Sequence, residues 1–284
     1  MAWAGSLRLA YRRDLHGRPG PATPRTVLHD VHDGPLRVLA SLYPEAPLVC
    51  HNVLVHPPGG LVGGDQLAIE VTLDTAAHAL ITTPGATRFY RSLGAAATQQ
   101  VGARLADGAR LEWLPLETIA YSGCIARNTM RFELAPGAEM IGWDLLALGL
   151  PASAQAFARG SFTQQIELPG RWLERGTIAA DDLRLLDSPL GWAGRRVLAT
   201  LWFAAGTALP GGRRDRLLDG ARALIAGDAL EHAAGATSPD PAVIVVRVLA
   251  PRVEPAMLLL TRLWAAWREA AWSLPACLPR VWRT

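Results

Sequence analysis

Between about residue 36 and residue 180 the sequence alternates short strand-like runs with turn residues, and this pattern constrains the fold more than any other feature. In residues 67–74, LAIEVTLD, apolar side chains occupy every second position, the period of a strand with one buried face. Residues 76–83, AAHALITT, predict the next strand, and Pro84-Gly85 suits a type II turn in which the glycine has a positive φ. The pattern predicts a mainly β body, and the lack of a fixed-period repeat argues against a propeller or a solenoid.

After residue 190 the spacing of apolar residues becomes helical. Residues 213–232 and 255–274 predict helices, and the β-branched run 242–250 predicts a buried strand between them. The second helix begins near Pro255, a residue suited to a first helical turn, and its three tryptophans are expected to pack in the core. Its charged residues, Arg262, Arg268 and Glu269, argue against a membrane span. We therefore expect a mainly β protein with two or three α-helices, mostly toward the C-terminus.

Composition limits the classes of partner and the compartment. All 28 Lys and Arg positions are arginine, yet the net charge is only +3 and the arginines are scattered, so no nucleic-acid-binding stripe is expected. The three cysteines form no CxxC pair, which suits a reducing compartment: Cys50, Cys124 and Cys277. Residues 1–14 lack the apolar core of a secretory signal. These features predict a cytoplasmic protein.

Residues 56–65, HPPGGLVGGD, hold two prolines, two Gly-Gly pairs, a histidine and an aspartate. A P-loop would need a lysine after its second glycine, but Asp65 follows Gly64, and the chain contains no lysine. A phosphate cradle is therefore excluded. The prolines predict an extended entry, and each Gly-Gly pair permits positive φ or close approach of another segment. Asp65 is expected to accept hydrogen bonds from amides of the turn.

The histidines and cysteines give only weak metal-binding candidates. Cys50 and His51 are adjacent on a predicted strand and point to opposite faces, and His51 and His56 diverge for the same reason. His29 and His32 would meet on a helical turn, but the Gly34-Pro35 pair that follows favours a loop. We expect no firm metal site, with Cys50 and His51 as the weak candidates.

Two further stretches carry chemistry-bearing side chains. Glu112 and Glu117 flank Trp113, and a buried glutamate here would suit a general acid with a raised pKa; the alternative is a glutamate that hydrogen-bonds the turn at Pro115. Residues 84–92 present Arg88 and Tyr90 directly after a turn. Arginine and tyrosine are residues that anchor protein interfaces, and ordinary loop structure is the alternative.

Several motifs, in order along the chain, together resemble one protein family. They are CHNVLVHPPGGLVGGDQLAIEVTL (50–73), LITTPGATRFYRS (80–92) and LEWLPLETIAY (111–121), with HDGPLRVLASLYPE (32–45), GWDLLALGLPASAQAFARG (142–160) and PRVWRT (279–284). This series resembles the urease accessory protein family UreD, called UreH in some organisms. Asp144 stands where glutamate is frequent in the family, and Arg88 where lysine is often seen. The resemblance implies a single UreD-type domain over residues 1–284.

The resemblance implies a fold and a function. The fold is a helically wound, multi-stranded β body with a few helices. The function is that of a non-catalytic scaffold for assembly of the dinickel centre of urease, bound to apo-urease and to a UreF-type protein that holds the GTPase UreG. Nickel is implied to pass through an internal tunnel, with no cofactor tightly bound. Tight binding would oppose onward transfer, because higher affinity slows release.

The candidate residues for partner binding or for the tunnel are His56, Asp65, Arg88, Tyr90, Glu112, Trp113 and Glu117. The candidates for shaping the motif are Gly59, Gly60, Gly63, Gly64, Pro84 and Gly85. Two alternative functions stay open at this point. One is a metal-dependent hydrolase that uses His51, His56, Asp65 and Glu112, and the other is a β-rich binding module with a different partner.

Overall fold

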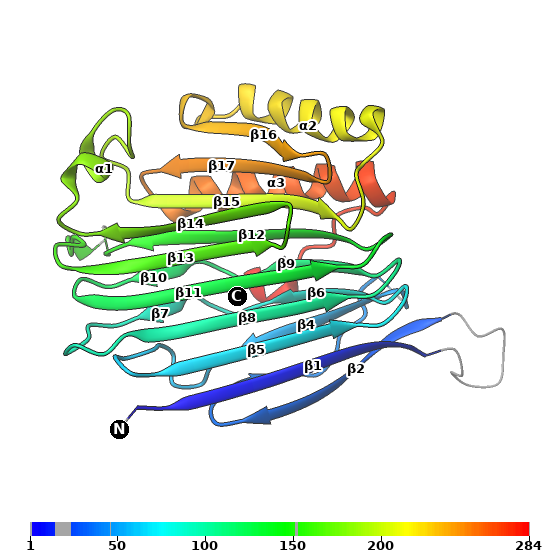
Figure 1. The fold of residues 1–284 in the computed structure, drawn as a ribbon, viewed down its shortest axis with the longest axis horizontal. Coiled ribbons are helices and arrows are strands. Elements are labelled where there is room, and N and C mark those ends of the chain that lie inside the picture. The colour runs from blue at the N-terminus through cyan, green and yellow to red at the C-terminus, as the bar shows by residue number, and fades with distance from the viewer. Residues whose placement is uncertain (1, 15–23, 46, 151–152, 284) are drawn as a thin grey trace.

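Two β-sheets stacked face to face form the body of the protein. The computed structural model describes residues 2–14, 24–45, 47–150 and 153–283. The seven-stranded sheet has the order β14-β13-β11-β8-β5-β1-β2, and the main path of the ten-stranded sheet is β16-β17-β15-β12-β9-β6-β4-β3. The short strands β7 and β10 join the second sheet beside β12. The prediction of a mainly β fold is confirmed (Figure 1).

The strands of the seven-stranded sheet are β1 (Ala4–Asp14), β2 (Arg25–Asp33), β5 (Gln66–Leu73), β8 (Ala97–Leu105), β11 (Cys124–Leu134), β13 (Gly160–Leu168) and β14 (Trp172–Ala179). Those of the ten-stranded sheet are β3 (Arg37–Val38), β4 (Val49–Val55), β6 (His78–Thr82), β7 (Thr87–Phe89), β9 (Arg110–Leu114), β10 (Thr118–Ala120), β12 (Glu139–Leu148), β15 (Val197–Ala205), β16 (Ala234–Asp240) and β17 (Val243–Ala250). The helices are α1 (Leu183–Asp187), α2 (Gly211–Ala226) and α3 (Val253–Trp272), with short 3₁₀ turns η2 (Glu231–Ala233) and η3 (Arg280–Arg283).

From β4 to β13 the chain winds helically, because successive long strands alternate between the two sheets and pair in parallel with the strand one turn earlier. Val49, His78, Arg110 and Glu139 lie side by side on neighbouring strands, so one turn spans about 30 residues, a length typical of repeat structures. The expectation against a solenoid is therefore wrong. The argument failed because backbone winding needs equal turn lengths and matched burial, and neither requires a repeated sequence.

The two sides of the ten-stranded sheet face two different hydrophobic cores. One core fills the space between the sheets, and the other lies between the ten-stranded sheet and the helices, where α3 packs on β12, β15 and β17. Strands covered on both faces are buried along their whole length, as in β6 and β12. The seven-stranded sheet has one face in solvent, and β5 shows the expected alternation of buried and exposed residues.

The predicted C-terminal elements are confirmed in type. Helix α3 covers nearly all of residues 255–274, and its three tryptophans are buried, while β17 matches residues 242–250. The helix predicted over 213–232 ends earlier, at Ala226, because Gly227 stands at its C-cap and the Asp228 carboxylate accepts a hydrogen bond from the Leu230 amide.

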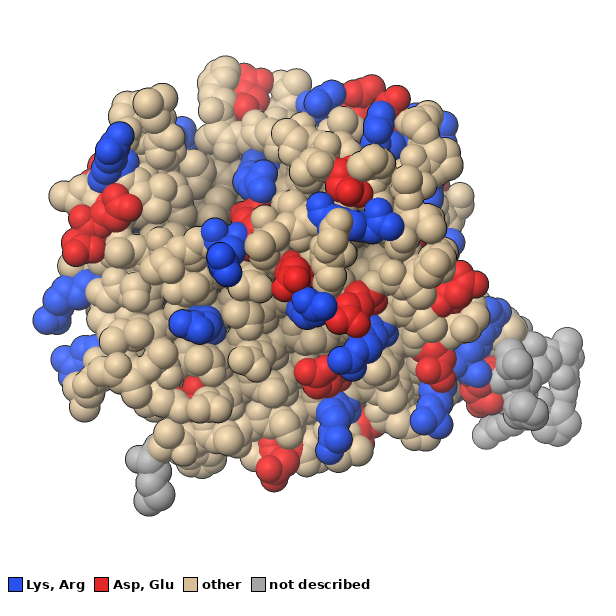
Figure 2. Space-filling model, viewed as in Figure 1, with Lys and Arg blue, Asp and Glu red and all other residues tan. Residues whose placement is uncertain are grey.

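The N-terminal region differs from the expectation. Two strands, β1 and β2, precede residue 36, and β1 pairs with both β2 and β5. The segment that holds His29 and His32 is therefore strand, not loop, because β2 pairs with β1 along its whole length. Figure 2 shows arginines and acidic side chains intermixed over the face formed by the seven-stranded sheet, consistent with the ion pairs of Arg131 with Glu133 and Glu167.

Candidate functional site

A cavity of about 260 Å³ lies between the two sheets and opens at the glycine-rich turn. One side of its mouth is formed by residues 54–61, which include His56, and the other by residues 83–88. Trp113 from β9 and Gln99 from β8 line its inner part. The structure thus brings together three of the sequence motifs, which lie far apart along the chain.

The glycine pairs behave as expected from the sequence. Gly59 and Gly64 have φ of +78° and +96°, values that residues with a side chain rarely adopt. Gly60 and Gly63 instead allow another segment to approach closely, and a Cβ on Gly60 would collide with the Tyr90 ring. In each pair, therefore, one glycine has a positive φ and the other allows a neighbouring segment of the chain to approach closely.

The type II turn predicted at Pro84-Gly85 is wrong, because Gly85 does not have the positive φ that this turn requires. The Thr83 hydroxyl closes the bend instead: it donates a hydrogen bond to the Gly85 carbonyl at 2.9 Å and accepts one from the Leu116 amide at 3.0 Å. The hydrogen bonds of Thr83 therefore hold this bend without a positive φ at Gly85.

Asp65 holds the turn and the N-terminal segment together. One carboxylate oxygen accepts a hydrogen bond from the Val62 amide at 2.9 Å, and the other accepts one from the Trp3 amide at 2.8 Å. The expected role of Asp65 in satisfying turn amides is confirmed. Nearby, partial burial lowers the pKa of His56, although the negative charge of Asp65 opposes this shift.

Three other predicted residues lie near the surface. Arg88 is exposed at the cavity mouth, and its guanidinium forms no hydrogen bond or ion pair with the described residues. Tyr90 is half-buried with its ring centroid 4.8 Å from that of Tyr121. Glu117 is also half-buried, and its backbone carbonyl accepts a hydrogen bond from the Thr87 amide at 2.9 Å. Of the three, Arg88 is the most open to a partner.

Trp113 lies inside the protein, between the sheets. Its side chain is almost fully buried, and its ring centroid is 6.5 Å from that of Phe132. Within the described part of the chain, the indole N–H of Trp113 has no hydrogen-bond acceptor. A residue in this position is unable to contact a partner directly, but it lines the inner end of the cavity.

A row of polar side chains crosses the interior between the sheets, starting from the cavity. We call it the interior polar row, and it consists of Gln99, Asn128, Asp144, Gln164, Glu174, Thr200 and Arg247. Gln99, Asn128 and Gln164 occupy matching positions on the neighbouring strands β8, β11 and β13. Asp144 faces them from β12 in the other sheet, and Asn128 and Gln164 both donate hydrogen bonds to its carboxylate.

The row continues from Asp144 to the edge of the molecule. Thr200 lies beside Asp144 on β15, and its hydroxyl donates a hydrogen bond to Glu174 at 3.3 Å. Arg247, on β17, donates to the same glutamate at 2.9 Å and is exposed to solvent. The interior polar row therefore links the inner end of the cavity with an exposed edge of the sheets.

Burial and, to a smaller extent, the nearby charge of Glu174 raise the pKa of Asp144 to about 7, although the hydrogen bond from Gln164 acts in the opposite direction. The Asp144 side chain is almost fully enclosed, with 4% of its surface exposed. The centre of the row is therefore a carboxyl group whose charge changes near neutral pH.

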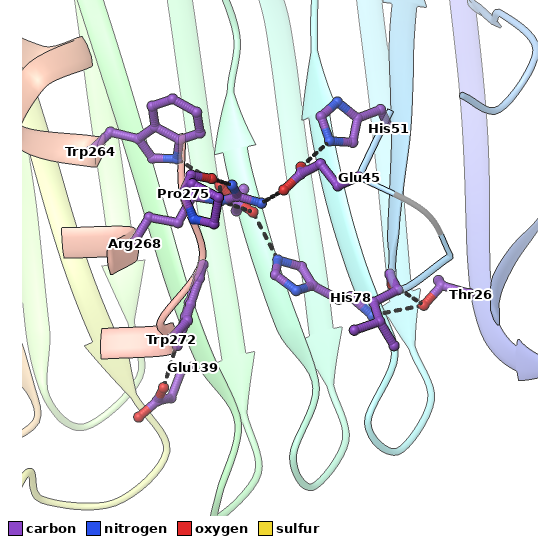
Figure 3. Close-up of polar contacts among 11 residues, drawn as sticks. Thr26, Glu45, His51, His78, Glu139, Trp264, Arg268, Trp272 and Pro275 are labelled. Carbon is purple, nitrogen blue, oxygen red and sulfur yellow. Dashed lines mark hydrogen bonds and ion pairs between the residues drawn. The ribbon is translucent and has the colours of Figure 1, made fainter. Parts of the chain in front are cut away.

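A second polar cluster lies on the other side of the ten-stranded sheet, beneath α3 (Figure 3). We call it the buried charge network, and it consists of Glu45, His51, His78, Glu112, Trp264 and Arg268. Arg268 is fully buried; it bonds Glu112, with Nε 3.2 Å from Oε1, and also bonds Glu45. Its guanidinium also donates to the Pro275 carbonyl, which ties the C-terminal tail to the network.

Glu112 is the centre of this network. His78 Nε2 lies 2.8 Å from one carboxylate oxygen, and the indole of Trp264 donates to the other at 2.6 Å. Burial alone would raise the pKa of Glu112, but His78, Arg268 and Trp264 together lower it. The interpretation of Glu112 as a general acid with a raised pKa is therefore wrong, and Glu112 is not the glutamate that would hydrogen-bond the turn at Pro115.

The four residues named for a metal-dependent hydrolase do not form a common site. His51 contacts Glu45, Glu112 contacts His78, and Asp65 holds backbone amides. Among the residues that the structure describes, no three His, Cys, Asp or Glu side chains are placed to hold one metal ion. The Cys50 thiol contacts Asn52 at 3.3 Å, away from His51 on the opposite face of β4. The geometry therefore contradicts a hydrolase site built from these four residues.

Sequence reasoning missed the interior polar row and most of the buried charge network. The signal for Asp144 was present, because a lone carboxylate stands in the otherwise apolar run 140–148. Asn128 and Gln164 had no comparable signal, since amides are frequent on the exposed faces of strands. Arg268 interrupts an otherwise apolar helical stretch, and nothing in the neighbouring sequence indicates its two distant carboxylate partners.

The match to known proteins covers the whole body just described. The model of the family described as UreD urease accessory protein matches residues 4–283. The chain belongs to the UreD urease accessory protein family. It is 63% identical to the urease accessory protein UreD of Leptothrix cholodnii over 100% of both chains. It is also 60% identical to that of Paracidovorax citrulli over 99% of both chains, and 59% identical to that of Methylibium petroleiphilum over 100% of both.

Membership of the UreD family agrees with the resemblance drawn from the sequence motifs. The central segment 142–160 contributes Asp144 to the interior polar row, although Pro151 and Ala152 of that segment lie outside the described residues. Within the described ranges, no helix of this UreD-family chain has both the length and the apolar character needed to cross a membrane.

Proposed function

We propose that this UreD-family chain is a non-catalytic scaffold that helps to deliver nickel to apo-urease, in a complex with a UreF-type protein and the GTPase UreG. The nickel is the cargo of the process and is held only transiently. The three cysteines, which are all free, support a cytoplasmic location. The family match supports an accessory role in urease maturation.

The observation that carries the nickel-transfer part of the proposal is the interior polar row. Its residues supply side-chain oxygens in the middle of an otherwise apolar interior, which is the chemistry a dehydrated cation needs for passage. Amide and carboxylate oxygens are hard, weak ligands for nickel compared with imidazole or thiolate. A row of such ligands, with only two carboxylates, favours movement of an ion over retention.

The docking part of the proposal concerns the outer surface. Arg88 is an exposed cation without a partner among the described residues, and it stands at the cavity mouth. Arginine is over-represented among residues that dominate binding energy at interfaces. We assign this mouth to contact with a partner protein, so that the cavity and the interior polar row would become continuous with a path in that partner.

One matched pair of variants on β13 distinguishes the passage of nickel from the binding of partner proteins. Gln164→Met removes the polar group of an interior residue, whereas Gln165→Met makes the same change one residue along, on the other face of the strand. We expect both variants to co-purify with the UreF-type and urease subunits. Only Gln164→Met should lower the nickel content and activity of urease matured in a strain that lacks the native gene.

Two results would reject the proposal. One is full urease maturation, with normal nickel content, in a deletion strain that lacks this protein altogether. The other is an isolated chain that never co-purifies with urease or with a UreF-type protein. Equal maturation with Gln164→Met and Gln165→Met would reject passage through the interior polar row while leaving the scaffold role intact.

A further inference from the structure

The centre of the interior polar row is closed to cations in this structure. Asn128 Nδ2 donates to one Asp144 oxygen at 3.2 Å, and Gln164 Nε2 donates to the other. The Asn128 carbonyl oxygen is turned away from Asp144, where it accepts a hydrogen bond from Gln99 Nε2 at 3.3 Å. Both amides thus direct the positive ends of their N–H bonds at the carboxylate, where a cation would have to bind.

The same side chains become cation ligands after one simple motion. The terminal amide of Asn or Gln is planar, and its oxygen and nitrogen ends have nearly the same size, so a half-turn about the last torsion exchanges them with little change in volume. After that rotation, the oxygens of Asn128 and Gln164 would face Asp144. One carboxylate and two amide oxygens then supply a set of ligands suited to a hard divalent cation.

The surroundings make this motion the least disruptive way to open the row. Asn128, Asp144 and Gln164 are all at least nine-tenths buried, so water is excluded from replacing the lost hydrogen bonds. The backbone around them is fixed in paired strands on both sheets. A rotation of these two amide groups, with Gln99 releasing its bond to Asn128, needs no strand to move.

We propose that Asn128 and Gln164 form an amide clasp on Asp144, which is closed without a cation and opens by rotation of both amides to present their oxygens to a divalent cation. The inference rests on the proposed passage of nickel through this row. It adds a gate, because a cation enters the centre only when its attraction to three oxygen-bearing groups exceeds the hydrogen bonds that are lost, which are the two to Asp144 and the one from Gln99 to Asn128. The clasp closes again when the ion moves on.

The first test replaces one amide of the clasp with a carboxylate, which is a cation ligand in either orientation. Gln164→Glu substitutes an oxygen for the N–H donor, so a cation meets the oxygens without any rotation and with one more negative charge. We expect the isolated protein to bind one Ni²⁺ about tenfold or more tightly than the unaltered chain, measured by isothermal titration calorimetry, because affinity at oxygen sites rises with ligand charge. Gln165→Glu, the same change on the other face of β13, should leave nickel binding unchanged.

A second test observes the amides in the unaltered protein, so it does not depend on the folding of a variant. Zn²⁺ serves as a diamagnetic probe, and the side-chain NH₂ signals of Asn128 and Gln164 are followed by NMR, with Asn128→Leu and Gln164→Met used for assignment. We expect both NH₂ signals to shift on addition of Zn²⁺. The signals of Gln165 and Gln100, which lie on the outer face of the same sheet, should stay in place.

The clasp is rejected if Gln164→Glu and Gln165→Glu bind nickel equally and Zn²⁺ leaves the Asn128 and Gln164 NH₂ signals unmoved. Either expected result alone supports the clasp. Failure of the proposed passage of nickel through this row has a different signature, namely normal nickel delivery to urease by the Gln164→Met variant. The two hypotheses are therefore tested by different measurements, one on the isolated chain and the other on matured urease.

Discussion

Single residues inside this protein form two polar groups of different character. The buried charge network brings the full charge of Arg268 against the carboxylates of Glu45 and Glu112. Such a network stabilises the fold only while all of its partners are present. The interior polar row is built mainly from amides around Asp144, which tolerate a change of hydrogen-bond partner at lower cost. The first group fits a structural role, and the second fits a role in transfer.

Removing the charge of Glu112 tests the structural role. Glu112→Gln keeps the shape of the side chain but leaves the fully buried Arg268 without one of its two anions. We expect the free energy of unfolding to fall by about 3 kcal/mol or more, as for other broken buried ion pairs. Urea denaturation followed by circular dichroism measures this loss.

Glu117→Gln is the matched control for that variant, because Glu117 belongs to the same motif but is half-buried and outside the network. Its effect should stay within about 0.5 kcal/mol, as for most substitutions near the surface. Similar losses in the two variants would show that Arg268 does not depend on Glu112.

Asp144 should make the stability of the protein depend on pH. Its pKa is about 7 in the folded chain, against 3.8 as the ordinary value, so the folded state holds its proton over this range while the unfolded state releases it. The contribution of Asp144 to the free energy of unfolding is therefore fully present below about pH 4 and is lost as the pH rises through 7. The total loss is at most about 4 kcal/mol. Asp144→Asn should remove this slope in urea titrations carried out across that range. An unchanged slope would contradict the raised pKa.

At the scale of secondary structure elements, the position of each strand in the two-sheet stack explains its sequence pattern. Strands of the seven-stranded sheet alternate, as in β5 and β11, because one face meets solvent. Strands β6 and β12 are apolar on both faces because one face meets the other sheet and the second meets the helices or the C-terminal tail. Two of the polar exceptions on these strands, His78 and Asp144, belong to the buried charge network and to the interior polar row respectively.

The turn elements give a test of the glycine motif. Gly60→Ala would place a Cβ against the ring of Tyr90, and the Arg88 carbonyl also lies close. We expect a loss of about 1–3 kcal/mol of folding free energy, typical of overpacking, measured by thermal or urea unfolding. Gly85→Ala, in the facing turn, has no atom within 4 Å of the added Cβ and should be nearly neutral. The opposite order of effects would contradict the close approach at Gly60.

At the scale of the whole molecule, the winding of the chain joins distant segments into one body. The C-terminal tail passes over the outer face of the ten-stranded sheet, where the Trp282 indole donates to the Thr82 hydroxyl at 2.8 Å. The Trp282 ring also lies 5.4 Å from Trp143 and 6.2 Å from Trp264, measured between centroids. The tail thus completes the second hydrophobic core instead of forming a separate appendage.

Trp282→Ala tests the contribution of the tail. The loss of the ring contacts and of the bond to Thr82 should lower the free energy of unfolding by about 2 kcal/mol, measured by urea denaturation. Trp3→Ala is the control near the other terminus, because the Trp3 side chain is exposed and its hydrogen bonds, to Asp65 and Gln66, are made by its backbone. Equal effects of the two substitutions would show that the tail does not stabilise the core.

Much of the fold was predictable, because the spacing of apolar residues along a segment indicates which of its side chains are buried. The alternation in residues 67–74 identified β5, and the apolar run 242–250 identified β17. The pairing of strands was not predictable from such patterns, since it depends on contacts between residues about 30 positions apart. The alternation of Leu7, Leu9 and Tyr11 also indicates strand β1, which the prediction of strands from about residue 36 onward did not include.

The candidate site was predictable only in part, for a related reason. The glycine turn and the turn before Arg88 each lie within one short stretch, so the sequence identified both. The interior polar row takes one residue from each of several strands in two sheets, so no short stretch contains more than one of its members. Glu112 was identified, but its chemistry depends on Arg268 and His78, which lie in other elements, and so the expected shift of its pKa had the wrong direction.

The winding of the strands also sets a limit on how this protein tolerates insertions and deletions. Gln99, Asn128 and Gln164 stand like successive rungs of a ladder, one on each of three adjacent strands, which are about 4.8 Å apart. Side chains alternate between the two faces of a strand. Inserting or deleting one residue within one of these strands would therefore turn its amide toward solvent and move a neighbouring apolar side chain out of the core. The interior polar row would then be interrupted at that strand, whereas insertions or deletions in the exposed loops between strands would leave the row intact.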